Sequence, residues 1–69
     1  MIISARNQIP GTIKAIHKGA TTAHVEIDVG GSVITASITN EAVDQLKLAT
    51  GQRAYAVIKA SDVMVGVED

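Results

Sequence analysis

Apolar and polar residues alternate along most of this chain, as they do in strands that bury one face against a core. The alternation is clearest over residues 22–29 and returns over residues 33–38. The inward side chains of the first run are Ala23, Val25, Ile27 and Val29. Gly30 and Gly31 lie between the runs, and both can adopt the positive φ of a tight turn. The pattern predicts a β-hairpin over about residues 22–38.

Four other segments are also expected to be extended. They are residues 2–8, 11–17, 53–59 and 62–67. Pro10 and Gly11 mark the start of the second of these segments, because proline suits the beginning or the edge of a strand. The first segment is expected to be a strand or an extended arm, and the last a short strand.

Residues 39–46 break the alternation and predict a helix. Thr39 or Asn40 can serve as its N-cap, and Glu41 suits the positive end of the helix dipole. We expect about two turns, ending near Lys47. Many short strands with one helix predict an all-β fold, either a small barrel or a sandwich. The place of the helix, between the fourth and fifth runs, resembles that in an OB-like barrel.

The composition makes a monomer difficult to stabilise. The chain has 69 residues, enough for a single domain over residues 1–69, and 46% of them are hydrophobic. Tyr55 is the only aromatic residue, and there is no cysteine to form a disulfide. Small domains with such small core side chains commonly rely on oligomerisation. We therefore expect several copies to share a core, with a monomer as the alternative.

The charge and the hydropathy exclude several classes of protein. Six basic and seven acidic residues give a net charge of −1, which excludes a generally basic nucleic-acid coat. The N-terminus lacks the apolar segment of a signal peptide, and no run approaches the roughly 18 apolar residues of a membrane span. We expect a cytoplasmic protein that contacts neither membranes nor nucleic acid.

Catalytic motifs are not apparent. No nucleophile elbow occurs, and the Gly30–Gly31 pair lacks the lysine and the helix of a phosphate-binding loop. His17, His24, Glu26 and Asp28 fit solvent-facing strand positions without a placed partner. We expect a protein that is not an enzyme and holds no bare metal cation.

Two short segments have a composition that suits a small anion. Ser4–Gln8 and Lys59–Asp62 each join one cation to a hydroxyl, with a small alanine nearby. A tetrahedral dianion favours positive charge, hydroxyl donors and accessible backbone N–H groups. Arg6 offers a fork of donors and Lys59 a compact charge. On composition alone, ordinary surface charges at strand ends remain the alternative.

The same segments resemble the molbindin, or Mop domain, family. The similar segments are Ser4–Gln8, Lys18–Ala20, Ile38–Thr39 and Val57–Met64, within a resemblance from Ile3 to Val67. The resemblance implies a cytoplasmic protein that binds molybdate and tungstate without catalysing a reaction and needs no cofactor. It also implies a five-stranded OB-like barrel, strand exchange between subunits, and a hexamer arranged as a trimer of dimers. Oxyanions would lie at the subunit interfaces.

The resemblance further implies two kinds of site. The first would use Ser4, Arg6, Lys59, the backbone N–H of Ala60, the neighbouring Ser61, and Thr39 from a partner subunit. The second would use the turn of Lys18, Gly19, Ala20 and Thr21. Ala42 stands where some relatives have a further serine.

The expected function is intracellular molybdate and tungstate binding for molybdenum storage or homeostasis. One alternative is a single-stranded nucleic-acid binder on the same barrel, although Tyr55 is then its only stacking residue. Another is a pure assembly module, in which Arg6 and Lys59 form ion pairs with Asp62 or Glu41 of another subunit.

Overall fold

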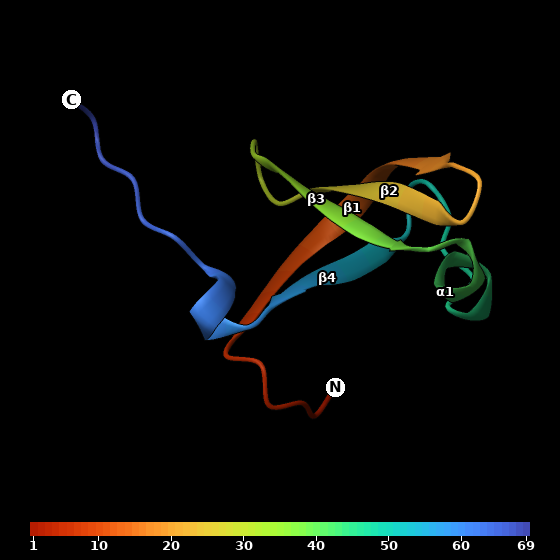
Figure 1. Cartoon of the computed structure of the whole chain (residues 1–69), viewed down its shortest axis with the longest axis horizontal. Coiled ribbons are helices and arrows are strands. Elements are labelled where there is room, and N and C mark those ends of the chain that lie inside the picture. Colours follow the sequence, from red (N-terminus) through yellow and green to blue (C-terminus); the bar gives the residue numbers. More distant parts are fainter.

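The computed structural model describes all 69 residues and consists mainly of strands with one short α-helix (Figure 1). In chain order the elements are β1 (Asn7–Lys18), β2 (Thr22–Asp28), β3 (Val33–Thr39), α1 (Asn40–Gln45), β4 (Arg53–Ile58) and the 3-10 turn η1 (Ala60–Asp62). The strands form one antiparallel sheet in the order β3-β2-β1-β4. The sheet curls into a half-barrel, and α1 lies at one end of it (Figure 1). The predicted all-β class with one helix is confirmed.

The curl of the sheet depends on β1, whose two halves pair with different neighbours. The half from Asn7 to Thr12 pairs with β4, and the half from Thr12 to Lys18 pairs with β2. A bulge between Ile13 and Ala15 shifts the register where β1 runs along β2. Bulges of this kind bend a strand and increase its twist. One long strand can therefore serve both sides of the half-barrel.

The start of β1 corrects the sequence-based prediction. The strand begins at Asn7 rather than at Gly11, and Pro10 lies within it, opposite Tyr55. Proline is tolerated there because β1 is paired on one side only at this point, and the missing N–H can face the unpaired side. Residues 2–6 form no strand.

The end of the chain also differs from the prediction. Residues 62–67 form no strand, so the sheet has four strands where the family resemblance implied five. Beyond η1 the chain runs extended, away from the half-barrel, to its C-terminus (Figure 1). Val63, Met64, Val65 and Val67 are 49%, 91%, 90% and 90% exposed. The segment pairs with neither edge strand of the sheet, β3 or β4.

The predicted hairpin and helix are confirmed. Gly30 and Gly31 both have positive φ, 93° and 99°, and the Val29 N–H donates to the Ser32 carbonyl to close the turn. Thr39 is the N-cap of α1, because its Oγ1 accepts a hydrogen bond from the Ala42 N–H at 3.0 Å.

The buried core is small. It contains six residues: Ile13, Ala23, Val25, Ile27, Val43 and Ala56. Next to it opens a hollow in which 11 of the 12 lining residues are hydrophobic, among them the largely exposed Leu46, Tyr55 and Val57. Much of the apolar surface is therefore not covered within one chain.

None of the helices is long and apolar enough to cross a membrane.

Candidate anion-binding site

The candidate site lies where β1 begins and β4 ends. The last ladder pair joins Asn7 to Ile58, so Arg6 and Lys59 are the first residues beyond the sheet on the two segments. A pocket opens between the two segments at this end. It is lined by Ser4, Ala5, Arg6, Lys59, Ala60 and Ser61. Five of the six residues predicted for the first site are thus brought together.

The two segments that line the pocket contribute the same kinds of side chain. Arg6 and Lys59 directly follow the Asn7–Ile58 pair at the end of the ladder, and Ser4 and Ser61 line the pocket beyond them. Ala5 and Ala60 line it as well, with side chains of a single methyl group. Ala5 was not among the predicted site residues, although its place between Ser4 and Arg6 indicates it. The pocket therefore combines two cations, two hydroxyls and two alanines.

The two cations of the pocket are not neutralised by carboxylates. The carboxylates that contact basic side chains are Asp44, paired with Lys18, and Glu26, in contact with His17, and neither contact involves Arg6 or Lys59. Two cations on facing walls repel one another, and an anion between them relieves that repulsion. The arrangement is suited to binding a negatively charged ligand.

Backbone donors add to this set through η1. The Asp62 N–H donates to the Lys59 carbonyl at 2.9 Å, and the Val63 N–H donates to the Ala60 carbonyl at 3.2 Å. The N–H groups at the start of such a turn have no acceptor within it. The N–H groups of Ala60 and Ser61 thus have no acceptor within the turn and are available to a ligand.

Thr39, the sixth predicted residue, does not lie in this pocket. It ends β3 and pairs with Thr22, next to the Lys18 end of β1, whereas the pocket lies at the Asn7 end. A straight strand of 12 residues spans about 35 Å. Thr39 and Arg6 of one chain therefore cannot contact the same small anion.

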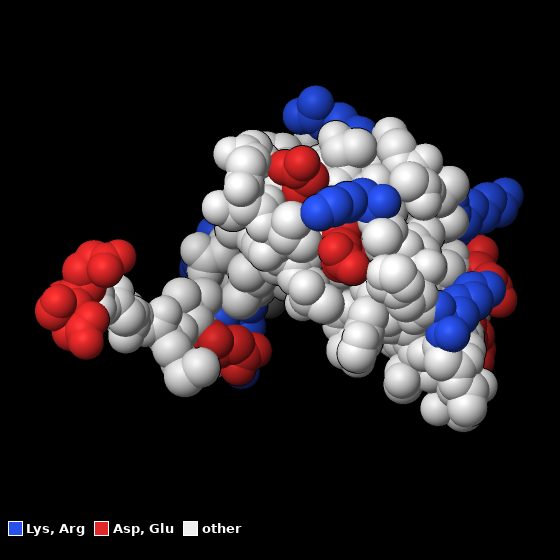
Figure 2. All heavy atoms as spheres, turned by 90° about the horizontal axis from the view of Figure 1, so that it is seen from above, with Lys and Arg blue, Asp and Glu red and all other residues white.

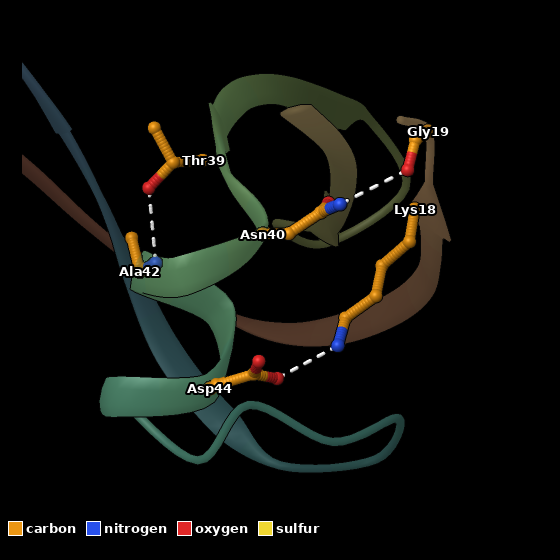
Figure 3. A network of polar contacts seen from close by, with 6 residues as sticks. All are labelled: Lys18, Gly19, Thr39, Asn40, Ala42 and Asp44. Carbon is orange, nitrogen blue, oxygen red and sulfur yellow. Dashed lines mark hydrogen bonds and ion pairs between the residues drawn. The ribbon is translucent and has the colours of Figure 1, made fainter. Parts of the chain in front are cut away.

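In the predicted second group, Lys18 ends β1, and residues 19–21 form the turn to β2 (Figure 3). The Asn40 side-chain amide donates to the Gly19 carbonyl at 2.9 Å, and the Asn40 N–H donates to the Thr21 carbonyl at 2.9 Å. The Lys18 Nζ donates to Asp44 Oδ1 at 2.7 Å. The turn is therefore tied to the first residues of α1, and its lysine is engaged by a carboxylate.

Two polar features in this region were not predicted. Asn40 makes the contacts that fix the turn, and its Oδ1 is buried without a hydrogen-bond partner. The only sequence signal for Asn40 was its value as a helix cap, a role that Thr39 takes instead. Ala20 and Thr21 are exposed at the tip of the turn.

The other titratable groups do not form a catalytic or metal-binding set. His17 lies opposite His24 across β1 and β2, and its Nε2 is 3.1 Å from Glu26 Oε2 on the exposed face. No group of three or more His, Cys, Asp or Glu side chains is arranged to hold a metal ion. Asp28 accepts hydrogen bonds from the Gly30 and Gly31 N–H groups, which lower the pKa of its carboxyl. Its role is therefore in the hairpin turn.

Comparison with known proteins identifies the family. The TOBE domain model matches residues 3–65. The chain is 49% identical over 69 residues to the probable molybdenum-pterin-binding protein of Haemophilus influenzae, covering 99% of this chain and 100% of that one.

Two solved structures have the same fold. MopII from Clostridium pasteurianum superimposes with a TM-score of 0.89 at 39% identity, over 96% of this chain and 100% of that one. The cytoplasmic molybdate-binding protein ModG, with molybdate bound, gives 0.90 at 46% identity, over 99% of this chain and 49% of that one. With the pocket at the paired ends of β1 and β4, these matches show that the chain belongs to the TOBE domain family, among its molbindin (Mop) proteins.

Proposed function

We propose that this protein binds molybdate, and also tungstate, in the pocket between Ser4–Arg6 and Lys59–Ser61, and that it serves molybdenum storage or homeostasis without catalysing a reaction. The observation that carries the proposal is the meeting of Arg6 and Lys59, neither with a carboxylate partner, on facing walls of one pocket. The names of its relatives, a molybdenum-pterin-binding protein and a molybdate-binding protein, support the choice of ligand.

The donors of the pocket suit a tetrahedral dianion. Arg6 and Lys59 supply two positive charges, and Ser4 and Ser61 supply hydroxyl protons. Charge-assisted hydrogen bonds of this kind are about twice as strong as neutral ones. A few preorganised donors are sufficient to hold the anion, so the net charge of −1 does not oppose binding.

The site is completed, in this proposal, by Thr39 of a second copy. Within one chain Thr39 and Arg6 lie at opposite ends of β1. The Thr39 Oγ1 already accepts the Ala42 N–H bond, which leaves its own proton free to donate to an anion. An oxyanion between subunits would therefore be held by a hydroxyl that the helix cap has already oriented.

The assembly follows from the apolar surface that one chain leaves uncovered. The hollow next to the core is almost entirely hydrophobic, and the segment Val63–Val67 is apolar and largely exposed. Exchange of such a segment between copies would bury both surfaces and supply the strand missing from each sheet. We propose a hexamer arranged as a trimer of dimers, located in the cytoplasm as the molybdate-binding protein ModG is.

The Lys18–Thr21 turn is proposed as a second oxyanion site. Lys18 is paired with Asp44, so an anion bound there would compete with that carboxylate for the ammonium group. We therefore expect this site to be weaker than the first.

The nucleic-acid alternative finds no support in the structure. Tyr55, the single aromatic residue, lines the apolar hollow, and no lysine or arginine lines it with Tyr55. Positive and negative side chains are interspersed over the face seen in Figure 2, where the acidic C-terminal residues stand apart at the end of the tail. A groove that tracks a single strand needs basic and aromatic groups side by side.

The proposal is tested by calorimetric titration of the protein with molybdate, tungstate and sulfate, together with its mass in solution with and without molybdate. We expect heat from molybdate and tungstate, little from sulfate, and a hexamer that the ligand stabilises. An absence of molybdate binding by an intact hexamer would support the pure assembly module, with Arg6 and Lys59 in ion pairs between subunits. A monomer that binds no molybdate would contradict both.

A further inference from the structure

The two residues that follow Arg6 each use a side-chain amide to hold one part of the pocket. Asn7 and Gln8 are the first residues of β1, and neither lines the pocket. Their amide groups turn back toward the backbone of the two pocket walls. They are therefore placed to fix the binding groups without touching the ligand.

Gln8 holds the N-terminal wall. Its Nε2 donates to the Ala5 carbonyl at 3.0 Å. This is the only hydrogen bond that links residues 1–6 to the rest of the chain. Since these residues lie outside the sheet, the Gln8 amide is what fixes the backbone between Ser4 and Arg6.

Asn7 holds the C-terminal wall against the N-terminal one. Its Nδ2 donates to the Ile58 carbonyl at 3.2 Å, across 51 residues of sequence, and the contact is partly buried. Ile58 directly precedes Lys59, and Asn7 directly follows Arg6. The bond therefore joins the two segments at the base of the pocket, one residue from each cation.

We propose that Asn7 and Gln8 are positioning residues that set the separation of the two pocket walls, and thereby the preference for a larger tetrahedral oxyanion over sulfate. The inference rests on the proposed function. A pocket of fixed width keeps donors at about 2.7–3.0 Å from the oxygens of one size of anion only. A smaller anion cannot reach all of them unless the walls approach each other.

Loss of either amide frees one wall to move. The donors on that wall then lose conformational entropy when molybdate binds, which weakens binding. They can also move closer together around sulfate. The loss of one neutral hydrogen bond corresponds to about 3- to 10-fold in an equilibrium constant. We expect weaker molybdate binding by about that factor, with sulfate binding unchanged or stronger. The ratio of the two dissociation constants therefore falls.

The test compares Gln8→Met and Asn7→Leu with the wild-type hexamer, because both substitutions keep the approximate shape and remove the amide without adding charge. Gln45→Met is the matched control, since its exposed amide bonds only to Glu41 within α1. Dissociation constants for molybdate and sulfate are measured by calorimetry, and melting temperatures are measured without ligand. Gln8 is exposed, so the Gln8→Met protein is expected to fold even if Asn7→Leu does not.

The ratio of dissociation constants separates positioning from general destabilisation. A merely destabilised protein loses binding-competent molecules and hence stoichiometry, while its remaining molecules keep the same preference. A reduced ratio in Gln8→Met, with the control unchanged, supports the inference. An unchanged ratio in Gln8→Met overturns it while the proposed function stands, and a wild-type protein that binds neither anion removes both.

Discussion

Arg6 and Lys59 each lie one residue beyond the last ladder pair of the sheet and line the same pocket, and neither has a carboxylate partner. The sheet itself creates this meeting, because the pairing of Asn7 with Ile58 brings together segments from the two ends of the chain. Two cations without carboxylate partners that line one pocket suit an anionic ligand.

The first prediction concerns these two cations. Arg6→Ala and Lys59→Ala should each weaken molybdate binding about 10- to 100-fold, because a charge-assisted hydrogen bond contributes about 1.5–3 kcal/mol. Calorimetric titration measures the effect. Arg53→Ala is the control, since Arg53 is exposed at the other end of β4 and lies outside the pocket. Unchanged affinity in both pocket variants would show that the site is elsewhere.

The second prediction separates two roles of Thr39. Thr39→Val removes both the cap for the Ala42 N–H and the hydroxyl proton, and should cost about 1 kcal/mol of stability as well as molybdate affinity. Thr39→Ser keeps both groups and should retain both properties. Thermal melting and molybdate titration of the two variants measure the difference. A valine variant that melts lower but binds as tightly would exclude Thr39 from the site.

The sequence predicted best those features that depend on neighbours along the chain. The hairpin around Gly30 and Gly31 and a helix cap at Thr39 or Asn40 follow from local backbone preferences, and the structure has the hairpin and a cap at Thr39. The pocket residues near Arg6 and Lys59 were predicted from composition and family resemblance, and their meeting follows from β1–β4 pairing. Which residue of β1 pairs with which residue of β4 could not be predicted from local backbone preferences.

The ends of the strands were predicted less well, for a physical reason. Pro10 and Gly11 are common at strand starts, but here one unpaired side of β1 tolerates the proline and a close approach of β2 requires the glycine. The expected strand over residues 62–67 does not form, although β3 and β4 each leave one edge of the sheet unpaired. Local sequence does not encode which side of a strand is paired.

The third prediction follows from Gly11. A Cβ at this position would lie 2.5 Å from the Asp28 carbonyl oxygen and 2.8 Å from Ile27 Cγ2. Gly11→Ala should therefore destabilise the protein by about 1–3 kcal/mol, because the β1–β2 contact must open. Chemical denaturation measures this, with Gly66→Ala as the control, since no atom lies within 4 Å of a Cβ there. Equal stability of the two variants would contradict the close packing.

The fourth prediction concerns Lys47, which follows the helix C-cap and is the only non-glycine residue at positive φ, 54°. This position favours glycine, which has no Cβ to clash in the left-handed conformation. Lys47→Gly should raise the free energy of unfolding by about 0.5–1 kcal/mol and leave molybdate affinity unchanged. Lys47→Ala, which keeps the Cβ, should not stabilise. A glycine variant no more stable than the alanine variant would contradict the assignment.

The last prediction concerns pH and the hairpin turn. Hydrogen bonds from the Gly30 and Gly31 N–H groups, with a smaller contribution from Lys14, hold the pKa of Asp28 below its ordinary value of 3.8. Because the folded state favours the charged carboxylate, its contribution to stability is complete above pH 3.8 and is lost as the pH falls through the lower, folded-state pKa.

Asp28→Asn keeps the acceptor oxygen without the charge. The wild type should therefore melt higher than Asp28→Asn at pH 7, and the difference should shrink in acid below pH 3.8. Melting curves of both proteins across this range measure the gap, with Glu68→Gln in the exposed tail as the control for a general charge effect. A gap that stays constant down to the acid transition would mean that the charge of Asp28 does not stabilise the turn, and that its acceptor oxygen alone is sufficient.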